Sequence, residues 1–115
     1  MNIRKFAQIF DGLKQAHGTF TIESKSSSGK TQGKATVVRE PRTKEHWEKH
    51  LAGEQSIGII PINEDNACRW GCIDIDQYNF DHKALIDKIQ AAKLPLVVCR
   101  SKSGGAHVFL FTDGF

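Results

Sequence analysis

The chain has 115 residues, of which 39% are hydrophobic and 25% are charged, so we expect one folded domain with a modest core. Its net charge of +3 allows an anionic partner but does not require one. No apolar run is long enough for a transmembrane helix, and no apolar segment of a secretory signal follows Met1.

The N-terminal part is predicted to form a helix followed by a hairpin. Residues 3–16 carry apolar side chains at helical spacing and stop near Gly18. Alternating side chains predict strands over residues 19–22 and 35–39. Residues 24–34 contain Ser, Gly and Lys without an apolar side chain, and predict a flexible basic loop that joins these strands. This loop is expected to be solvated, with contact to nucleic acid as the alternative.

The middle of the chain is predicted to form a second helix and a strand. Thr43 is a suitable N-cap for a helix that carries Trp47, and Gly53 is a suitable stop. Residues 56–62 form an apolar run that predicts a strand, followed by a polar turn over residues 63–66. Both tryptophans of the chain are expected in the core or at its rim.

The C-terminal part is predicted to contain three strands and one helix. The strands are expected over residues 69–76, 96–99 and 106–111. Asp81 starts the intervening helix, whose inward-facing residues are predicted to be Leu85, Ile86 and Ile89. The resulting order, α-β-β-α-β-β-α-β-β, predicts an α/β (α+β) fold with helices packed on a mixed or antiparallel sheet.

An Asp-x-Asp motif ends the strand predicted over residues 69–76. Because successive side chains of a strand alternate between faces, Ile73 and Ile75 are expected to point into a core. Asp74 and Asp76 then share the other face, roughly 6.5–7 Å apart at Cα. Such carboxylates repel each other unless a cation neutralises them, and oxygen ligands suit Mg²⁺ or Mn²⁺. Taken alone, the motif also fits two solvated carboxylates.

A polar turn joins the last two predicted strands. Gly104 and Gly105 permit unusual backbone conformations, and consecutive amides of such a turn can form an anion nest. The surrounding side chains add hydroxyl groups, positive charge and an imidazole that suit a triphosphate. They are Arg100, Ser101, Lys102, Ser103 and His107. The spacing is not that of a Walker A loop, and a plain hairpin turn is the structural alternative.

The remaining histidines and the cysteines predict no further site. His46 and His50 are four residues apart on a predicted helix, which suits metal ligands, but no zincin motif accompanies them and we expect them at the surface. The three cysteines are Cys68, Cys72 and Cys99. An odd number of cysteines without Cys-x-x-Cys spacing predicts free thiols and a cytoplasmic protein.

Two segments together resemble the archaeo-eukaryotic primase superfamily, most closely its primase-polymerase branch of bacterial and phage conflict systems. The run from Gly58 to Ile62, a polar turn and Trp70 to Asp76 resemble the first catalytic motif. The run from Ser101 to His107 resembles the second, a Ser-and-His turn. The resemblance covers roughly residues 36–111.

This resemblance implies template-directed nucleotidyl transfer on a single-stranded DNA template. Asp74 and Asp76 would bind Mg²⁺ or Mn²⁺, and His107 would contact the phosphates of the incoming nucleoside triphosphate. Ser101, Ser103 and the Gly104–Gly105 amides would lie nearby, with Arg100 and Lys102 in supporting roles.

The family has a third motif, an acidic residue on a later strand. Only Asp113 follows the second motif here, and it comes too soon. We therefore expect residues 1–115 to be a single domain that forms the N-terminal part of a primase-polymerase catalytic core. A downstream domain or a second chain would complete the site.

Two other classes of function compete with this interpretation. A primase-like protein without the third acid would be a non-catalytic module that binds nucleotide or single-stranded nucleic acid. An unrelated metal-dependent enzyme with Asp-x-Asp, such as a nuclease or glycosyltransferase, is the other alternative.

Overall fold

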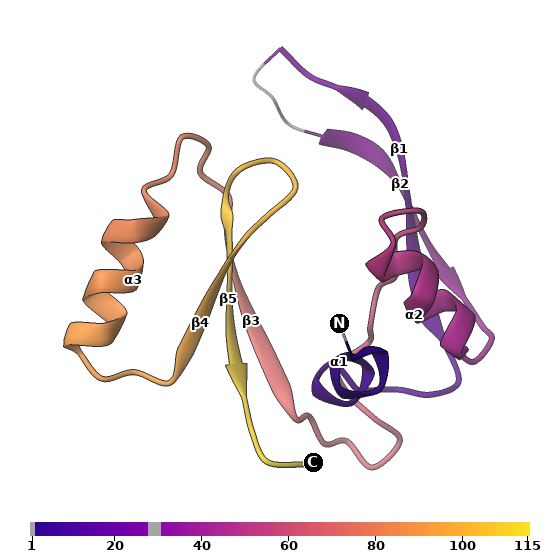
Figure 1. The fold of residues 1–115 in the computed structure, drawn as a ribbon. Helices are drawn as coiled ribbons and strands as arrows, with labels where there is room; N and C mark the ends of the chain where they lie inside the picture. The colour runs from indigo at the N-terminus through magenta and orange to yellow at the C-terminus, as the bar shows by residue number, and fades with distance from the viewer. Residues whose placement is uncertain (1, 28–30) are drawn as a thin grey trace.

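The computed structural model describes residues 2–27 and 31–115. These residues form three helices and two antiparallel sheets, which confirms the predicted α+β class (Figure 1). In chain order the elements are α1 (Ile3–Ile9), β1 (His17–Lys25), β2 (Thr31–Val38), α2 (Lys44–Leu51), β3 (Trp70–Ile75), α3 (His82–Ala91), β4 (Leu96–Arg100) and β5 (Ala106–Phe111). No helix among the described residues is long and apolar enough to cross a membrane.

The three C-terminal strands form one sheet in the order β3-β5-β4. Because β5 is antiparallel to both neighbours, β3 and β4 run parallel and end at the same edge of the sheet. Helix α3 packs beside β4, and the buried side chains of Ile89, Ala106 and Val108 form the core of this part. The strands over residues 96–99 and 106–111 were thus predicted correctly.

Two residues assigned to the core from the sequence are exposed. The side chain of Ile73 is 61% exposed, because β3 is an edge strand separated by β5 from the strand on which α3 packs. Ile86 is 36% exposed, so α3 turns only the side that carries Ile89 fully inward. The alternation of β3 is correct, but only Ile75 of its two isoleucines is half-buried.

The predicted hairpin is present, but its strands are longer than expected. Ser24 and Lys25 belong to β1, and residues 31–34 belong to β2, so the prediction of a loop over residues 24–34 is wrong. Backbone pairing continues past the last apolar side chain, with a shift of register between Ile22 and Ser24. Residues 28–30 of the predicted loop lie outside the described residues.

The first helix is shorter than predicted, since α1 ends at Ile9 rather than near residue 16. The chain then runs against the segment that contains Ile60, whose carbonyl accepts a hydrogen bond of 2.8 Å from the Leu13 N–H. A Cβ atom on Gly12 would lie 2.1 Å from that oxygen, so only glycine allows this approach. Backbone pairing with the segment that contains Ile60 therefore takes the place of the helical turns predicted after Ile9.

The strand predicted over residues 56–62 is also wrong. This segment makes only an isolated bridge, between Gly58 and Gly18, and is otherwise irregular. The two glycines approach so closely that a Cβ on Gly58 would lie 3.1 Å from the Gly18 Cα. Pro61 has no N–H with which to extend the pairing.

The two other helices begin as predicted, and α2 also ends as predicted. The Thr43 N–H donates a hydrogen bond of 2.8 Å to Nδ1 of His46 at the start of α2, and Gly53 follows the helix with a positive φ of 77°. The Asp81 carboxylate accepts a hydrogen bond of 3.0 Å from the Ala84 N–H at the start of α3.

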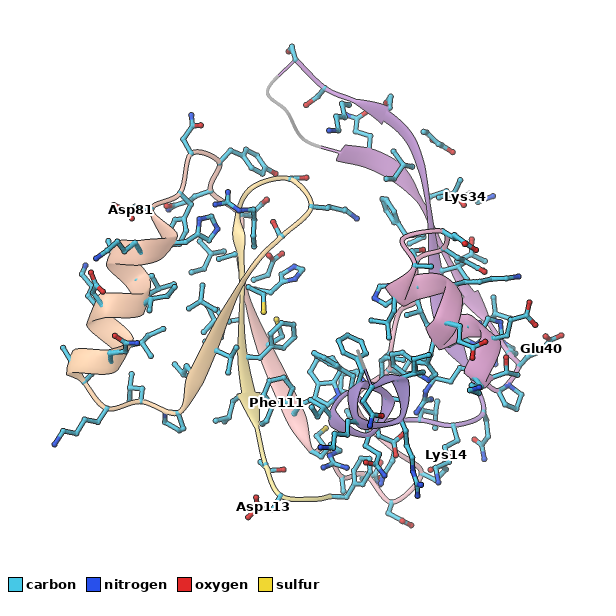
Figure 2. The ribbon with its side chains drawn as sticks, viewed as in Figure 1. Lys14, Lys34, Glu40, Asp81, Phe111 and Asp113 are labelled. Atoms are coloured by element: carbon cyan, nitrogen blue, oxygen red, sulfur yellow. The ribbon has the colours of Figure 1, made fainter. Side chains whose placement is uncertain are left out.

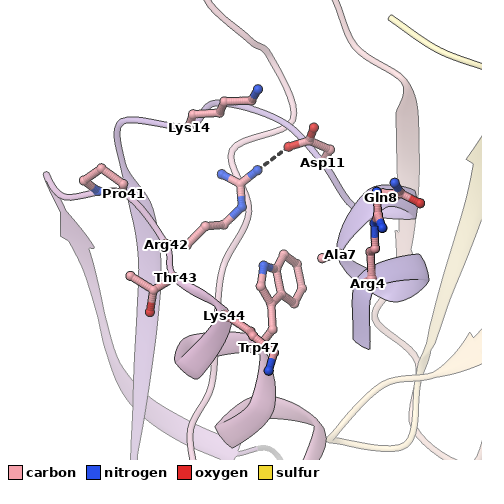
Figure 3. Close-up of a pocket in the computed structure, with 10 residues that line it drawn as sticks. All are labelled: Arg4, Ala7, Gln8, Asp11, Lys14, Pro41, Arg42, Thr43, Lys44 and Trp47. Atoms are coloured by element: carbon pink, nitrogen blue, oxygen red, sulfur yellow. Dashed lines mark hydrogen bonds and ion pairs between the residues drawn. The ribbon is translucent and has the colours of Figure 1, made fainter. Parts of the chain in front are cut away.

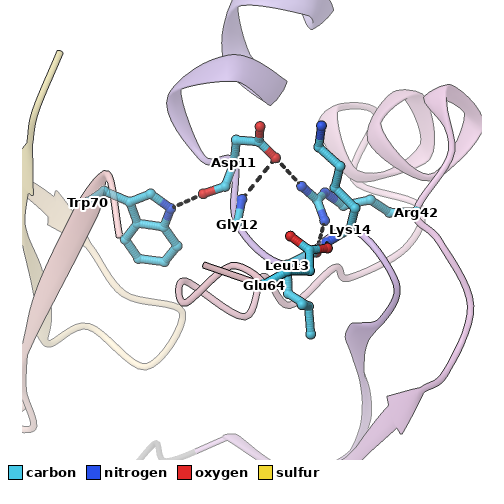
Figure 4. Close-up of polar contacts among 7 residues, drawn as sticks. All are labelled: Asp11, Gly12, Leu13, Lys14, Arg42, Glu64 and Trp70. Atoms are coloured by element: carbon cyan, nitrogen blue, oxygen red, sulfur yellow. Dashed lines mark hydrogen bonds and ion pairs between the residues drawn. The ribbon is translucent and has the colours of Figure 1, made fainter. Parts of the chain in front are cut away.

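Aromatic side chains join α1 to the three-stranded sheet. The ring of Phe10 lies 5.3–5.6 Å, between centroids, from those of Trp70, Phe109 and Phe111. Figure 2 shows Phe111 on β5 where the sheet faces α1. Trp70 also donates a 3.0 Å hydrogen bond from Nε1 to the Asp11 carbonyl (Figure 4). The tryptophans lie as predicted, with Trp47 buried and Trp70 at the rim.

Candidate nucleotide and metal site

The Asp-x-Asp motif lies at the carboxyl end of β3. Asp74 is the penultimate residue of the strand, and Asp76 follows its last residue. The Asp74 side chain is 69% exposed and lies on the face of the sheet opposite to that of Ile75. No Lys or Arg forms an ion pair with either carboxylate within the described ranges.

His107 is the direct partner of Asp74 on the neighbouring strand β5. Its Nε2 atom lies 3.6 Å from Oδ1 of Asp74, and its side chain is 43% exposed. This separation is too long for a hydrogen bond but allows an ionic attraction when the imidazole is protonated. On its other side His107 pairs with Cys99 of β4.

The turn between β4 and β5 brings the second motif to the same edge of the sheet. The Ser101 N–H donates to the Gly105 carbonyl, and the Gly104 N–H donates to the Ser101 carbonyl, both at 3.0 Å. Gly104 has a φ of +92°, a conformation that favours glycine. The Gly104 amide is therefore used within the turn, and in this structure it is not aimed at a ligand.

Gly105 fixes the distance between the turn and β3. A Cβ atom here would lie 2.3 Å from the Ile75 carbonyl oxygen, which only the absence of a side chain permits. The Gly105 carbonyl also accepts a 2.7 Å hydrogen bond from Nε2 of His82, at the start of α3. The turn is thus held by both the strand that carries Asp74 and the helix that follows it.

These elements surround a cavity of about 410 Å³, which we call the acidic pocket. Seven of the nine residues predicted from the sequence line it, together with two that were not predicted. The lining residues are Phe20, Asp74, Asp76, Tyr78, Arg100, Ser101, Lys102, Ser103 and His107. Gly104 and Gly105 shape the turn but do not line the pocket, and Gly105 is buried.

Phe20 of β1 was missed because it lies far from both motifs in the sequence. Its ring sits under the Lys102 side chain, with Nζ 3.4 Å from the ring centroid. The same ring covers Gly33 of β2, where a Cβ atom would lie 2.7 Å from it. Ser56 holds the Phe20 backbone by accepting from its N–H at 2.6 Å and donating to its carbonyl at 2.7 Å. No sequence signal distinguished Phe20 from the other aromatic residues.

Tyr78 was also missed, although its place two residues after Asp76 could have indicated it. Its hydroxyl donates a hydrogen bond of 2.6 Å to Oδ1 of Asp76. This bond to the Asp76 carboxylate, with smaller effects of burial and of the nearby negative charges, raises the pKa of Tyr78 above its usual value. The phenol therefore stays protonated at neutral pH and acts as a donor.

The acidic pocket offers oxygen ligands of the kind that Mg²⁺ and Mn²⁺ prefer, from Asp74 and Asp76. Two exposed carboxylates without a Lys or Arg partner among the described residues fit such an ion in charge and in donor type. Three or more metal-binding side chains do not gather anywhere in the described part of the chain. The residues present thus fit part of a divalent-metal site.

The other candidate ligands serve local structure. His46 accepts from the Thr43 N–H as part of the α2 cap, and Nδ1 of His50 lies 3.3 Å from the Gln55 carbonyl oxygen. Both are half-buried rather than at the open surface. All three cysteines are free thiols, as predicted.

A comparison with protein families finds a family that matches most of the chain. The family described as "TOTE conflict system, Archaeo-Eukaryotic Primase domain" matches residues 4–114, which is nearly the whole chain. No curated protein matches the sequence. The match includes both motifs of the acidic pocket and the hairpin that carries Phe20.

Proposed function

Because the chain belongs to the archaeo-eukaryotic primase domain family of TOTE conflict systems, we propose that it is part of a catalytic core for template-directed nucleotidyl transfer. The observation that carries this proposal is the acidic pocket, where two metal-type carboxylates face a Ser-and-His turn across neighbouring strands. A nucleoside triphosphate is the ligand class that suits both features, because it carries a divalent metal ion for the carboxylates and phosphate oxygens for the turn.

In this proposal Asp74 and Asp76 hold Mg²⁺ or Mn²⁺. A divalent ion bound there would neutralise phosphate charge and lower the pKa of the attacking 3′-hydroxyl. Tyr78 supports the arrangement by holding the Asp76 carboxylate through its 2.6 Å hydrogen bond. That hydrogen bond leaves the second carboxylate oxygen of Asp76 for the ion.

The other wall of the acidic pocket binds the phosphates of the incoming nucleotide. His107 donates a hydrogen bond from Nε2 to a phosphate oxygen. This atom faces the Asp74 carboxylate, and so it lies beside the metal ion that Asp74 is proposed to hold. Arg100 and Lys102 supply positive charge, and the hydroxyl groups of Ser101 and Ser103 supply further donors. The Lys102 ammonium, held over the Phe20 ring, contacts a phosphate from that position.

The third acidic ligand of the family is proposed to come from outside these residues, from a further domain or from a second chain. Single-stranded DNA is the proposed template. A non-catalytic module that binds nucleotide or single-stranded nucleic acid is the second candidate. It is favoured by one observation, namely that the described residues place only two carboxylates in the lining of the acidic pocket.

A metal-dependent nucleotide titration tests the proposal. Wild type should bind a nucleoside triphosphate only with Mg²⁺ or Mn²⁺, and both Asp74→Ala and His107→Ala should weaken that binding about tenfold or more. The pair Asp65→Ala and Asp113→Ala removes the same charge from exposed positions outside the pocket and should bind normally. Equal binding by the Asp74 variant and wild type would refute the proposed site.

Primer extension by the assembled protein separates the two candidates. If the core is catalytic, Asp74→Ala/Asp76→Ala abolishes extension while the control pair retains it. Nucleotide binding without extension by the assembled wild-type protein would favour the binding module. A preference for sugar nucleotides would instead favour a glycosyltransferase.

A further inference from the structure

A second cavity, of about 500 Å³, lies at the base of the hairpin (Figure 3). Its walls come from α1, from the segment that leads into β1, and from the segment that leads out of β2 into α2. We call it the basic cavity, and it is lined by Arg4, Ala7, Gln8, Asp11, Lys14, Pro41, Arg42, Thr43, Lys44 and Trp47. None of these residues belongs to the two motifs of the acidic pocket.

Among the described residues, four cationic side chains and a single carboxylate line the basic cavity. Arg42 is 8% exposed and is bound to the Asp11 carboxylate and to the Leu13 carbonyl, so this cation and this anion neutralise each other (Figure 3). The Arg42–Asp11 pair builds the floor of the cavity and contributes little net charge to a ligand.

The other three cations remain available. Neither Arg4 nor Lys14 forms a side-chain ion pair with any residue that the structure describes. Lys44 pairs with Glu48 one turn along α2, but both groups are exposed, and such pairs are weak. Three cations therefore line one cavity, and the nearby Glu64 carboxylate accepts a hydrogen bond of 3.4 Å from the Lys14 backbone N–H rather than pairing with its ammonium.

The start of α2 and the apolar side chains of the basic cavity also suit an anionic ligand. Thr43 and Lys44 lie at the start of α2, the end of a helix at which backbone N–H groups carry partial positive charge. Ala7, Pro41 and the buried Trp47 provide an apolar surface beside these charges. Positive charge next to an apolar wall suits a phosphate that carries an organic group.

We infer that the basic cavity binds a backbone phosphate of a single-stranded nucleic acid. The volume is in the range of sites for organic ligands, well above what a lone phosphate ion would fill. The hairpin connects it to the acidic pocket, since Lys14 precedes β1 and Phe20 lies within β1. A strand that enters the acidic pocket along the hairpin therefore passes the basic cavity.

This inference rests on the proposed function only in taking nucleic acid as the partner. The binding itself needs no divalent metal and none of the residues of the acidic pocket. It is therefore measured in EDTA, and also in an Asp74→Ala/Asp76→Ala background, so that its failure and that of the nucleotide site are separate results.

The test is fluorescence anisotropy of a short oligodeoxythymidylate without a terminal phosphate, bound to the full chain. Arg4→Ala/Lys14→Ala should weaken binding about tenfold and make the salt dependence shallower by about 0.7, because one phosphate contact on a single strand contributes about that amount to the slope. The matched control is Lys5→Ala/Lys88→Ala. Lys5 neighbours Arg4 on α1, and Lys88 is an exposed residue of α3, away from the hairpin.

A fall in affinity confined to the cavity variant supports the inference. An equal fall in both variants would mean that only overall charge matters, and would overturn it. Unchanged binding of the cavity variant would overturn it as well. Circular dichroism checks folding, and Lys14→Gln alone provides the same comparison, with Lys88→Gln as its control, if the double variant unfolds.

Discussion

Asp74 and His107 lie directly opposite each other on antiparallel strands, with Oδ1 and Nε2 3.6 Å apart. This relationship unites two motifs that α3 and β4 separate in the sequence. It also predicts that the two residues act together on a metal-bound nucleotide. Residues in contact commonly show interaction energies of about 0.5–3 kcal/mol in double-mutant cycles.

We therefore expect the losses of nucleotide affinity in Asp74→Ala and His107→Ala to be non-additive. The double variant should lose less free energy of binding than the sum of the single variants, by about 1 kcal/mol. Isothermal titration of a nucleoside triphosphate with Mn²⁺ measures the cycle. The same cycle with His46→Ala in place of His107→Ala serves as the control, because His46 belongs to the α2 cap. Additive losses for Asp74 and His107 would contradict a shared ligand.

Gly105→Ala should reduce stability and nucleotide binding together. The new Cβ atom would lie 2.3 Å from the Ile75 carbonyl oxygen and would force the turn away from the strand that carries Asp74. Overpacking of this kind typically costs about 1–3 kcal/mol. Thermal unfolding and nucleotide titration give the two measurements. Gly71→Ala in β3 is the matched control, since a Cβ there meets no atom within 4 Å. Equal melting temperatures for the two variants would show that this contact is not constraining.

Phe20→Ala should weaken nucleotide binding, because the acidic pocket loses an aromatic wall and the surface on which Lys102 rests. Phe20→Tyr keeps a ring of the same kind and should retain most of the affinity. The contact with the ammonium accounts for only about 0.5–1 kcal/mol at an exposed site. A loss of about threefold to tenfold is therefore expected once the lost wall is included. Similar losses in both variants would mean that the aromatic face is not what matters.

Cys72 should ionise at a higher pH than an ordinary thiol. Partial burial is the main cause that raises its pKa from the usual value of 9.0, and the Asp74 carboxylate raises it further. Because the thiolate is the reactive form, alkylation of Cys72 should reach half its maximal rate above pH 9. Asp74→Asn removes a negative charge and should move this midpoint to lower pH, while burial keeps part of the increase.

The Cys72 prediction is measured by mass spectrometry of the alkylated peptide at a series of pH values. Asp65→Asn removes a charge from the exposed turn before β3 and serves as the control. A midpoint that does not move in Asp74→Asn would show that the carboxylate and the thiol do not interact across the face of β3.

Most of the helices and strands could be predicted because their signals are local. The caps at Thr43 and Asp81 and the stop at Gly53 depend on nearby backbone groups, so the sequence around them is sufficient. The predictions failed where partners distant in the sequence decided the outcome. Pairing of Leu13 with Ile60 ended α1 early, and cross-strand pairing extended the hairpin through polar residues.

In the candidate site, too, local signals could be predicted and contacts between distant segments could not. The spacing of Asp74 and Asp76 and the family resemblance around His107 led to the prediction of a metal and nucleotide site, and the structure places all three residues around one pocket. The aromatic wall was not predictable, since Phe20 reaches the pocket only through the fold of the hairpin over the β4–β5 turn.

By itself, then, the sequence determined which side chains are candidates for the chemistry and which short elements hold them, since both depend on residues close along the chain. Only the tertiary structure decided which of these elements meet. The order β3-β5-β4 sets Asp74 beside His107 and brings the ends of β3 and β4 to one edge. That order depends on hydrogen bonds and burial between distant segments, and no local pattern of residues specifies it.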